Sequence, residues 1–236
     1  MVDFSTLGRE RLEAMLEAGR EAVNCHRVLA KSGDNIVGEL LKGHETFFEW
    51  DHYPSGDVYD RDSHSQYYYH AHPQEERIGE HGHFHTFLRP KGMPDDIRPA
   101  RIEGAEMPED LDDWLSHLIG ISMDKHGIPI RLFTTNRWVT GEVWYEAADV
   151  CRMLDLFEID LAPPSWPVNC WLTAMVRLFR PQIEALIHER DVGVARWAEK
   201  NETDDVYEDR RFEIVSSVDI SIDDQVAALV AALERA

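Results

Sequence analysis

Five of the twelve histidines lie within sixteen residues of the chain, in two short motifs with His-x-His spacing. They are His70, His72, His81, His83 and His85. In an extended strand, side chains at positions i and i+2 point to the same face, with Cα atoms about 6.5 to 7 Å apart. This spacing therefore places two imidazoles side by side, close enough for both to reach one ion. The motifs predict a site for a divalent metal.

The geometry of such a site depends on the register of the hairpin that joins the two motifs. On a straight strand His81 and His85 would lie about 13 Å apart, too far for one ion to bind all three histidines of the second motif. We therefore expect one His-x-His pair to combine with ligands from the neighbouring strand. If His72 opposes His81, then His70 opposes His83 and both motifs project from one face. A shift by one residue sends them to opposite faces.

Mixed imidazole and carboxylate ligands suit Zn²⁺ or Fe²⁺, which are the metal cofactors we expect. Supporting ligands could come from Glu80, Asp51 or His52. Tyr68 and Glu80 are the candidates for a proton donor or for groups that orient the ligands. A site with three protein ligands and an open position would be catalytic, because the metal could activate water or bind a substrate oxygen. Hydrolysis and metal-dependent oxygen chemistry are the two reaction classes that follow.

The sequence also allows other interpretations of the histidines. They could be half-buried polar residues of a hairpin, some of them hydrogen-bonded to tyrosines. One of them could act without a metal as a general acid or base beside Tyr68 or Tyr69. A function from a different class is a non-catalytic module, in which the His- and Tyr-rich sheet face binds a small-molecule ligand or a protein.

A weaker group of candidate residues lies at 134–142, where a predicted strand gives way to a helix. Asn136, Arg137 and Trp138 could orient an anionic or aromatic substrate, because backbone N–H groups point outward at such a junction. A capping turn around Thr140 and Gly141 explains the same residues without any ligand.

Hydrophobic patterning predicts the elements that must position these residues. We expect N-terminal helices over 6–43, a sheet region over 46–135, a helical region over 140–200, and a strand and helix over 211–236. The sheet region contains expected strands around 46–53, 65–72, 81–88, 117–123 and 128–135. His117 shares its expected strand face with Ile119 and Ile121 and reads as a core residue, although it could reach the histidines from a third strand. The order predicts a single α+β domain, with an antiparallel sheet of about six strands packed against helices from the N- and C-terminal parts.

The composition limits the partners of the protein. A net charge of −21 disfavours binding to nucleic acid or to an anionic membrane, since both attract proteins through a positive field. No apolar run approaches the roughly 18 to 20 residues of a membrane span, and the N-terminus lacks the features of a signal peptide. Cys25, Cys151 and Cys170 are odd in number and far apart, so a disulfide framework is not expected. These features predict a cytoplasmic protein.

Four segments of the chain carry a resemblance to a known family. They are Tyr67-Tyr-Tyr-His-Ala-His-Pro, Glu80-His-Gly-His-Phe-His, Thr134-Thr-Asn-Arg-Trp-Val-Thr-Gly-Glu and Pro164-Ser-Trp-Pro-Val-Asn. Through them the chain resembles a family of uncharacterised bacterial proteins with a domain of unknown function, and the resemblance covers most of the chain. It implies no activity, so the site assignments rest on residue types and spacing alone.

Overall fold

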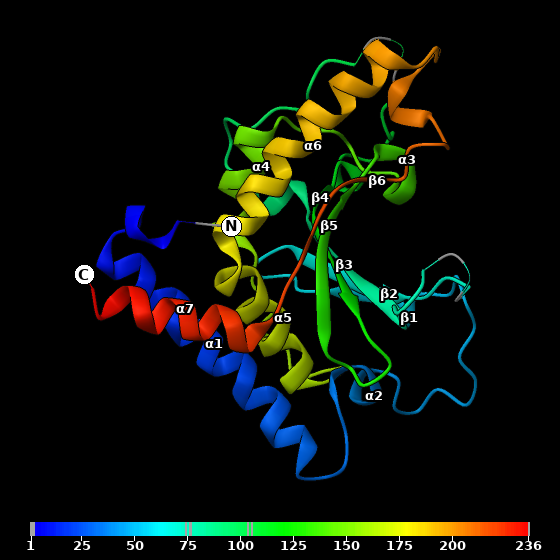
Figure 1. Cartoon of the computed structure of the whole chain (residues 1–236). Helices are drawn as coiled ribbons and strands as arrows, with labels where there is room; N and C mark the ends of the chain where they lie inside the picture. The colour runs from blue at the N-terminus through cyan, green and yellow to red at the C-terminus, as the bar shows by residue number, and fades with distance from the viewer. Residues whose placement is uncertain (1–2, 74, 76, 103, 105, 236) are drawn as a thin grey trace.

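The computed structural model describes residues 3–235 except positions 74, 76, 103 and 105. Within this range six antiparallel strands form one sheet, in which each strand pairs with its neighbours in sequence. The strands are β1 (Tyr53–Tyr59), β2 (Ser65–His70), β3 (Gly82–Leu88), β4 (Ser116–Met123), β5 (Pro129–Thr135) and β6 (Ile214–Asp219). Helices from both ends of the chain pack against this sheet (Figure 1). The predicted α+β fold is confirmed.

Several of the helices lie against one face of the sheet. The helices are α1 (Arg9–Ala30), α2 (Ile36–Leu40), α3 (Arg137–Thr140), α4 (Ala147–Met153), α5 (Trp166–Leu178), α6 (Arg180–Lys200) and α7 (Ile222–Leu233). Trp171 of α5 contacts Phe84 of β3, and Ser216 of β6 donates a hydrogen bond to the carbonyl oxygen of Leu186 in α6. Helices α1 and α7 pack together further from the sheet, and α1 also packs on α5. Among the described residues, no helix has both the length and the apolar character needed to cross a bilayer.

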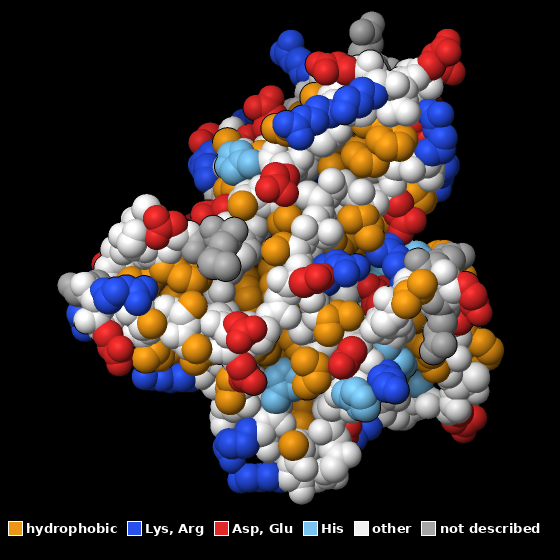
Figure 2. Space-filling view, in the orientation of Figure 1, with side chains coloured by type: hydrophobic (Ala, Val, Ile, Leu, Met, Phe, Trp, Pro, Cys, Tyr) orange, Lys and Arg blue, Asp and Glu red, His pale blue; other side chains and the backbone are white. Residues whose placement is uncertain are grey.

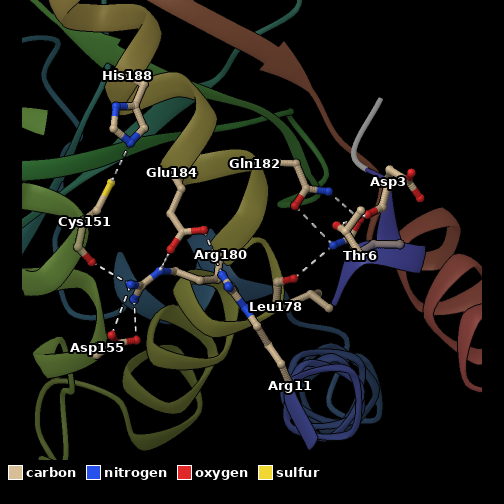
Figure 3. A network of polar contacts seen from close by, with 11 residues as sticks. Asp3, Thr6, Arg11, Cys151, Asp155, Leu178, Arg180, Gln182, Glu184 and His188 are labelled. Atoms are coloured by element: carbon tan, nitrogen blue, oxygen red, sulfur yellow. Dashed lines mark hydrogen bonds and ion pairs between the residues drawn. The ribbon is translucent and has the colours of Figure 1, made fainter. Parts of the chain in front are cut away.

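A polar network around Arg180 ties these helices together (Figure 3). The Arg180 guanidinium bonds to Asp155 at 2.5 Å, to Glu184 at 3.0 Å and to the carbonyl oxygen of Cys151 at 2.6 Å. Arg11 of α1 also bonds to Glu184, at 2.8 Å. The start of α6 is thus joined both to α1 and to the end of α4.

Charged side chains of both signs are scattered over the face of the molecule seen in Figure 2. On this face the negative groups do not gather over one element.

The first strand begins later than the sequence predicts. Residues 46–52 form no strand, and β1 begins only at Tyr53, where the expected strand ends, and runs through the turn-forming residues Pro-Ser-Gly-Asp. Gly56 and Asp57 have positive φ angles of 84° and 59°, and the pairing between β1 and β2 shifts between Tyr53 and Val58. The turn-like residues therefore lie in an irregularity within the strand, which bends without ending.

The helix expected from Thr140 also begins later. Asn136 caps the single turn of α3, and Gly141 ends that turn in the left-handed conformation, with a φ of 64°. The next helix starts only at Ala147. A glycine in this conformation is a common helix C-terminus, so the Thr-Gly pair stops one helix and does not start another.

Candidate metal centre

The hairpin of β2 and β3 has the register that places both histidine motifs on one face. His70 is paired with His83, and Tyr68 is paired with His85. The alternate residues of both strands pack in the core against the helices. The side chains of these four residues therefore lie on the face of the sheet opposite the helices.

Three histidines converge at the end of this hairpin. His70, His72 and His83 each offer one ring nitrogen, and these three atoms lie within 4.8 Å of one another. The Nε2 atoms of His70 and His83 are 2.7 Å apart. Around a tetrahedral Zn²⁺ with bonds of about 2.0 to 2.1 Å, neighbouring nitrogens lie about 3.3 Å apart, so the widest separation among these three nitrogens would shorten by up to about 1.5 Å on binding an ion. The three histidines could therefore hold a metal ion.

Glu80 fixes the orientation of His83. Its Oε1 lies 2.6 Å from Nδ1 of His83, and the two side chains are only 6% and 1% exposed, respectively. Because the carboxylate accepts the Nδ1 proton, the lone pair on Nε2 of His83 faces the other two histidines. Burial acts to raise the pKa of Glu80, but the hydrogen bond from His83 and the electrostatic interaction with that ring outweigh burial, so the pKa of Glu80 is lowered. A carboxylate on the outer nitrogen of a histidine is typical of metal sites.

Replacing Glu80 with glutamine should weaken Zn²⁺ binding by about 10- to 100-fold. The amide oxygen can still accept the hydrogen bond from His83, but it supplies no negative charge to strengthen that ligand. Competition with a chromophoric chelator would measure the affinity, with Glu75→Gln, a change of an exposed carboxylate in the same loop, as the control. An affinity within about twofold of wild type would show that Glu80 does not support the ligand set.

Burial favours the neutral form of His70 and His83. It lowers the pKa of His70 to about 2, with the neighbouring histidines and Arg77 acting in the same direction. Burial also lowers the pKa of His83, against the opposing effect of Glu80. Neutral imidazole is the form that binds a metal, so these side chains need to lose no proton first.

His85 lies beside the three histidines but bonds to a different partner. Its ring centroid is 4.8 Å from that of His83 and 5.2 Å from that of His70. Its Nδ1 lies 2.9 Å from Nε2 of His117. In the part of the chain that the structure describes, the buried Nε2 of His85 has no hydrogen-bond partner. This nitrogen is available next to the proposed ligands.

A bulge brings His117 to this face. The pairing of β3 with β4 shifts after Thr86, so that His117 lies opposite Phe87 and Ile119 lies opposite Thr86. The extra residue reverses the alternation of β4 at this point. The expectation that His117 shares a face with Ile119 and Ile121 is wrong, and His117 instead reaches the histidines from a third strand.

The structure places His81 apart from the other four histidines of the two motifs. Its Nδ1 lies 2.6 Å from the Tyr69 hydroxyl, and its ring packs near Phe47. Regular pairing of β3 begins only at Gly82, so His81 does not follow the alternation that aligns His83 with the cluster. His81 therefore lies with residues that pack towards the core and not with the candidate ligands.

Tyr68 lies beside the histidines, where a proton donor could act. Its ring centroid is 5.4 Å from that of His70 and 5.1 Å from that of His85. His52 stacks on the same ring at 3.6 Å, with the planes 8° apart. Burial raises the pKa of Tyr68, so its hydroxyl stays protonated and can donate a hydrogen bond.

Comparison with known proteins identifies the family of this chain. The model of a family described as Domain of unknown function (DUF6969) matches residues 16–220, which include all six strands. The chain belongs to this family. Searches of curated proteins and of solved structures found no match. The predicted resemblance is confirmed, and the function of this DUF6969 domain has to be inferred from its own side chains.

The weaker candidate residues of the DUF6969 chain bond to the segment that precedes β6. Asn136 caps α3 with its side chain, and Arg137 pairs with Glu208 at 2.5 Å. Trp138 donates its indole N–H to the carbonyl oxygen of Phe212 at 3.0 Å. These contacts give all three a structural role, and binding of a substrate by them stays a prediction.

Phe133 and Arg77 also pack near the histidines of the DUF6969 chain, although the sequence did not indicate either residue. Phe133 of β5 meets the ring of His83 at 5.1 Å, and the Arg77 guanidinium lies 5.6 Å from the Phe133 centroid. Arg77 also pairs with Glu213. A Cβ atom on Gly120 would lie 2.4 Å from the Phe133 ring, so this glycine gives the phenylalanine room beside the histidines. No sequence signal ties a loop arginine or a strand phenylalanine to the histidines.

Proposed function

We propose that this DUF6969 protein binds a divalent metal, Zn²⁺ or Fe²⁺, through His70, His72 and His83. The observation that carries the proposal is the convergence of three ring nitrogens within 4.8 Å. The carboxylate of Glu80 on His83 supports it, because such a group orients the ligand and raises its basicity. Cu²⁺ and Ni²⁺ would also bind if offered, since imidazole ligands follow the general order of metal affinities.

The more specific function that we propose is that of a metal-dependent enzyme. Three protein ligands are the number found in catalytic zinc sites, whereas structural sites use four. A water molecule or a substrate oxygen would take the remaining position, for hydrolysis or for oxygen chemistry. Tyr68, held protonated by burial, would donate a hydrogen bond there, and Glu80 would act through His83.

The metal proposal is tested by replacing one ligand and one matched histidine. His70→Ala should bind Zn²⁺ at least about 100-fold more weakly than wild type in competition with a chelator, because only two histidine ligands remain. His81→Ala is the control, since it removes a histidine of the same motifs whose ring bonds to Tyr69. That variant should stay within about threefold of wild type. Equal affinities of wild type and a folded His70→Ala protein would contradict the proposal.

A non-catalytic binding module is the second candidate, and exposed aromatic residues beside the histidines favour it. Phe48 and Trp50 are 58% and 55% exposed, and the Trp50 ring lies 4.2 Å from that of His72. Trp50 also has a φ of 71°, a left-handed conformation that is rare for a bulky residue and often marks a functional segment. A folded protein that takes up neither Zn²⁺ nor Fe²⁺ on titration would favour this module over the enzyme.

A further inference from the structure

A cavity of about 790 Å³ adjoins the candidate metal centre on the side of β1. Five of its lining residues carry flat rings, and two others carry guanidinium groups: His44, Phe48, His52, Tyr53 and Tyr59, and Arg61 and Arg89. Small-molecule sites combine such apolar and aromatic walls with a few polar groups. The cavity is large enough for a small organic ligand.

His52 forms a wall shared by the cavity and the candidate metal centre. One side of its ring stacks on Tyr68 at 3.6 Å, and its edge meets the ring of His70 at a centroid distance of 5.8 Å. Its Nδ1 lies 2.9 Å from Oδ1 of Asp57, another residue of the cavity wall. A molecule in the cavity would therefore be one imidazole ring away from a proposed metal ligand.

A chain of hydrogen bonds holds this wall in place. Gln66 donates its amide N–H to Oδ2 of Asp57 at 2.7 Å, and Arg89 donates Nε–H to Oε1 of Gln66 at 2.6 Å. Both oxygens of Asp57 are thus engaged, one by Gln66 and one by His52. The carboxylate of Asp57 is thus held in the wall by hydrogen bonds to both of its oxygens.

Arg61 lines the cavity and could bind an anion there. Its guanidinium carbon lies 5.6 Å from the ring centroid of Tyr59, and that of Arg89 lies 5.2 Å from the same centroid. Arg89 is 3.3 Å from Asp113, whereas Arg61 forms no ion pair with any residue that the structure describes. Two guanidinium groups thus lie on one tyrosine of a cavity wall that also carries the carboxylates of Asp51 and Asp57.

We propose that this cavity binds a small organic monoanion with a flat aromatic body, such as an aromatic carboxylate. Guanidinium groups bind carboxylates through paired hydrogen bonds, and the rings of the wall can stack on an aromatic body. Asp51 also lines the cavity, and its charge disfavours a dianion such as phosphate. The role of this ligand as the substrate class of the metal centre rests on the proposed function, but its binding does not.

The test uses benzoate as the probe, titrated into the full chain by isothermal calorimetry with and without Zn²⁺. Benzamide has the ring without the charge, acetate has the charge without the ring, and inorganic phosphate is the dianion. Benzoate should bind at least about tenfold more tightly than each of these. Arg61→Gln should weaken benzoate binding by about tenfold or more, whereas Arg20→Gln, which changes an exposed arginine of α1, should leave it unchanged.

The outcomes separate this inference from the proposed metal function. Benzoate that binds no more tightly than benzamide, or phosphate that binds more tightly than benzoate, would overturn the inference. So would a folded Arg61→Gln protein with wild-type affinity for benzoate. Binding of benzoate without any uptake of Zn²⁺ would support the cavity and contradict the metal centre. Uptake of Zn²⁺ without binding of benzoate would overturn the cavity proposal alone.

Discussion

Acidification of the metal-free protein from pH 6.5 to pH 5 should lower its free energy of unfolding by several kcal/mol. Burial lowers the pKa of four clustered histidines, to about 2 for His70 and to about 3 for His117. The pKa values of His83 and His85 are lowered for the same reason. Unfolding returns all four to an ordinary value of 6.5, so below that pH the unfolded chain binds more protons than the folded one. The contribution of these neutral histidines to the free energy of unfolding is therefore complete above pH 6.5 and is lost as the pH falls.

The size of this loss follows from the number of groups. Each histidine changes the free energy of unfolding by up to about 1.4 kcal/mol per pH unit. Glu142 acts in the opposite direction, because burial raises its pKa to about 7 and the folded state then holds a proton that the unfolded state releases above pH 4.5. When the opposing effect of the one carboxyl group is subtracted from that of the four histidines, the free energy of unfolding changes by at most about 4 kcal/mol per pH unit.

Urea unfolding followed by circular dichroism between pH 7.5 and pH 5, with EDTA present, would measure the slope. His117→Gln should reduce it by about 1.4 kcal/mol per pH unit, since one buried histidine is removed. The control His188→Gln changes an exposed histidine and should leave the slope unchanged. A free energy of unfolding that is constant across this range would show that the histidines are not buried in the neutral form.

Replacement of Gly82 by alanine should both destabilise the protein and impair metal binding. A Cβ atom at this position would lie 2.6 Å from the carbonyl oxygen of His70 and 2.5 Å from the hydroxyl of Tyr69. One of these atoms belongs to the backbone of the paired strand, so β2 and β3 must move apart beside the His70–His83 pair. We expect a loss of about 1 to 3 kcal/mol in the free energy of unfolding, as is usual for overpacking.

Urea unfolding and chelator competition on the same preparation would test both effects. Gly8→Ala is the control, because a Cβ atom there would meet no heavy atom within 4 Å. Its stability should change by less than about 1 kcal/mol. A Gly82→Ala protein with wild-type stability and wild-type affinity for Zn²⁺ would contradict the close packing of the hairpin beside the site.

The strands that carry the histidines were predictable because their pattern is local. Alternation and aromatic content indicated β2 and β3. The two histidine motifs allowed two registers of this hairpin, and the structure has the register that pairs His70 with His83. The position of His117 was not predictable in the same way. It depends on one extra residue in β4, which moves the side chain of His117 to the other face of the sheet. The hydrophobic pattern of the sequence does not indicate this extra residue.

The first strand and the residues around the histidine cluster show a second limit of prediction from the sequence. Residues 46–52 alternate like a strand, but the chain there is held by tertiary contacts, among them a hydrogen bond from the backbone N–H of Phe48 to the hydroxyl of Tyr53. Phe133 meets His83 from a strand distant in sequence, and Arg77 of the loop between the two motifs packs on Phe133. The spacing within one motif carries no information about these contacts. Residue types and spacing thus indicated the chemistry, whereas the neighbours of the site depend on the tertiary fold.

The most direct test of the metal centre is elemental analysis by mass spectrometry of untagged protein, purified without added metal or chelator. Wild type, His83→Ala and His81→Ala should be compared in one experiment. The proposed site predicts about one Zn or Fe per chain in wild type and in His81→Ala, and loss of that metal in a folded His83→Ala protein. Folded wild-type protein that contains no metal and takes up neither Zn²⁺ nor Fe²⁺ on titration would contradict the metal centre.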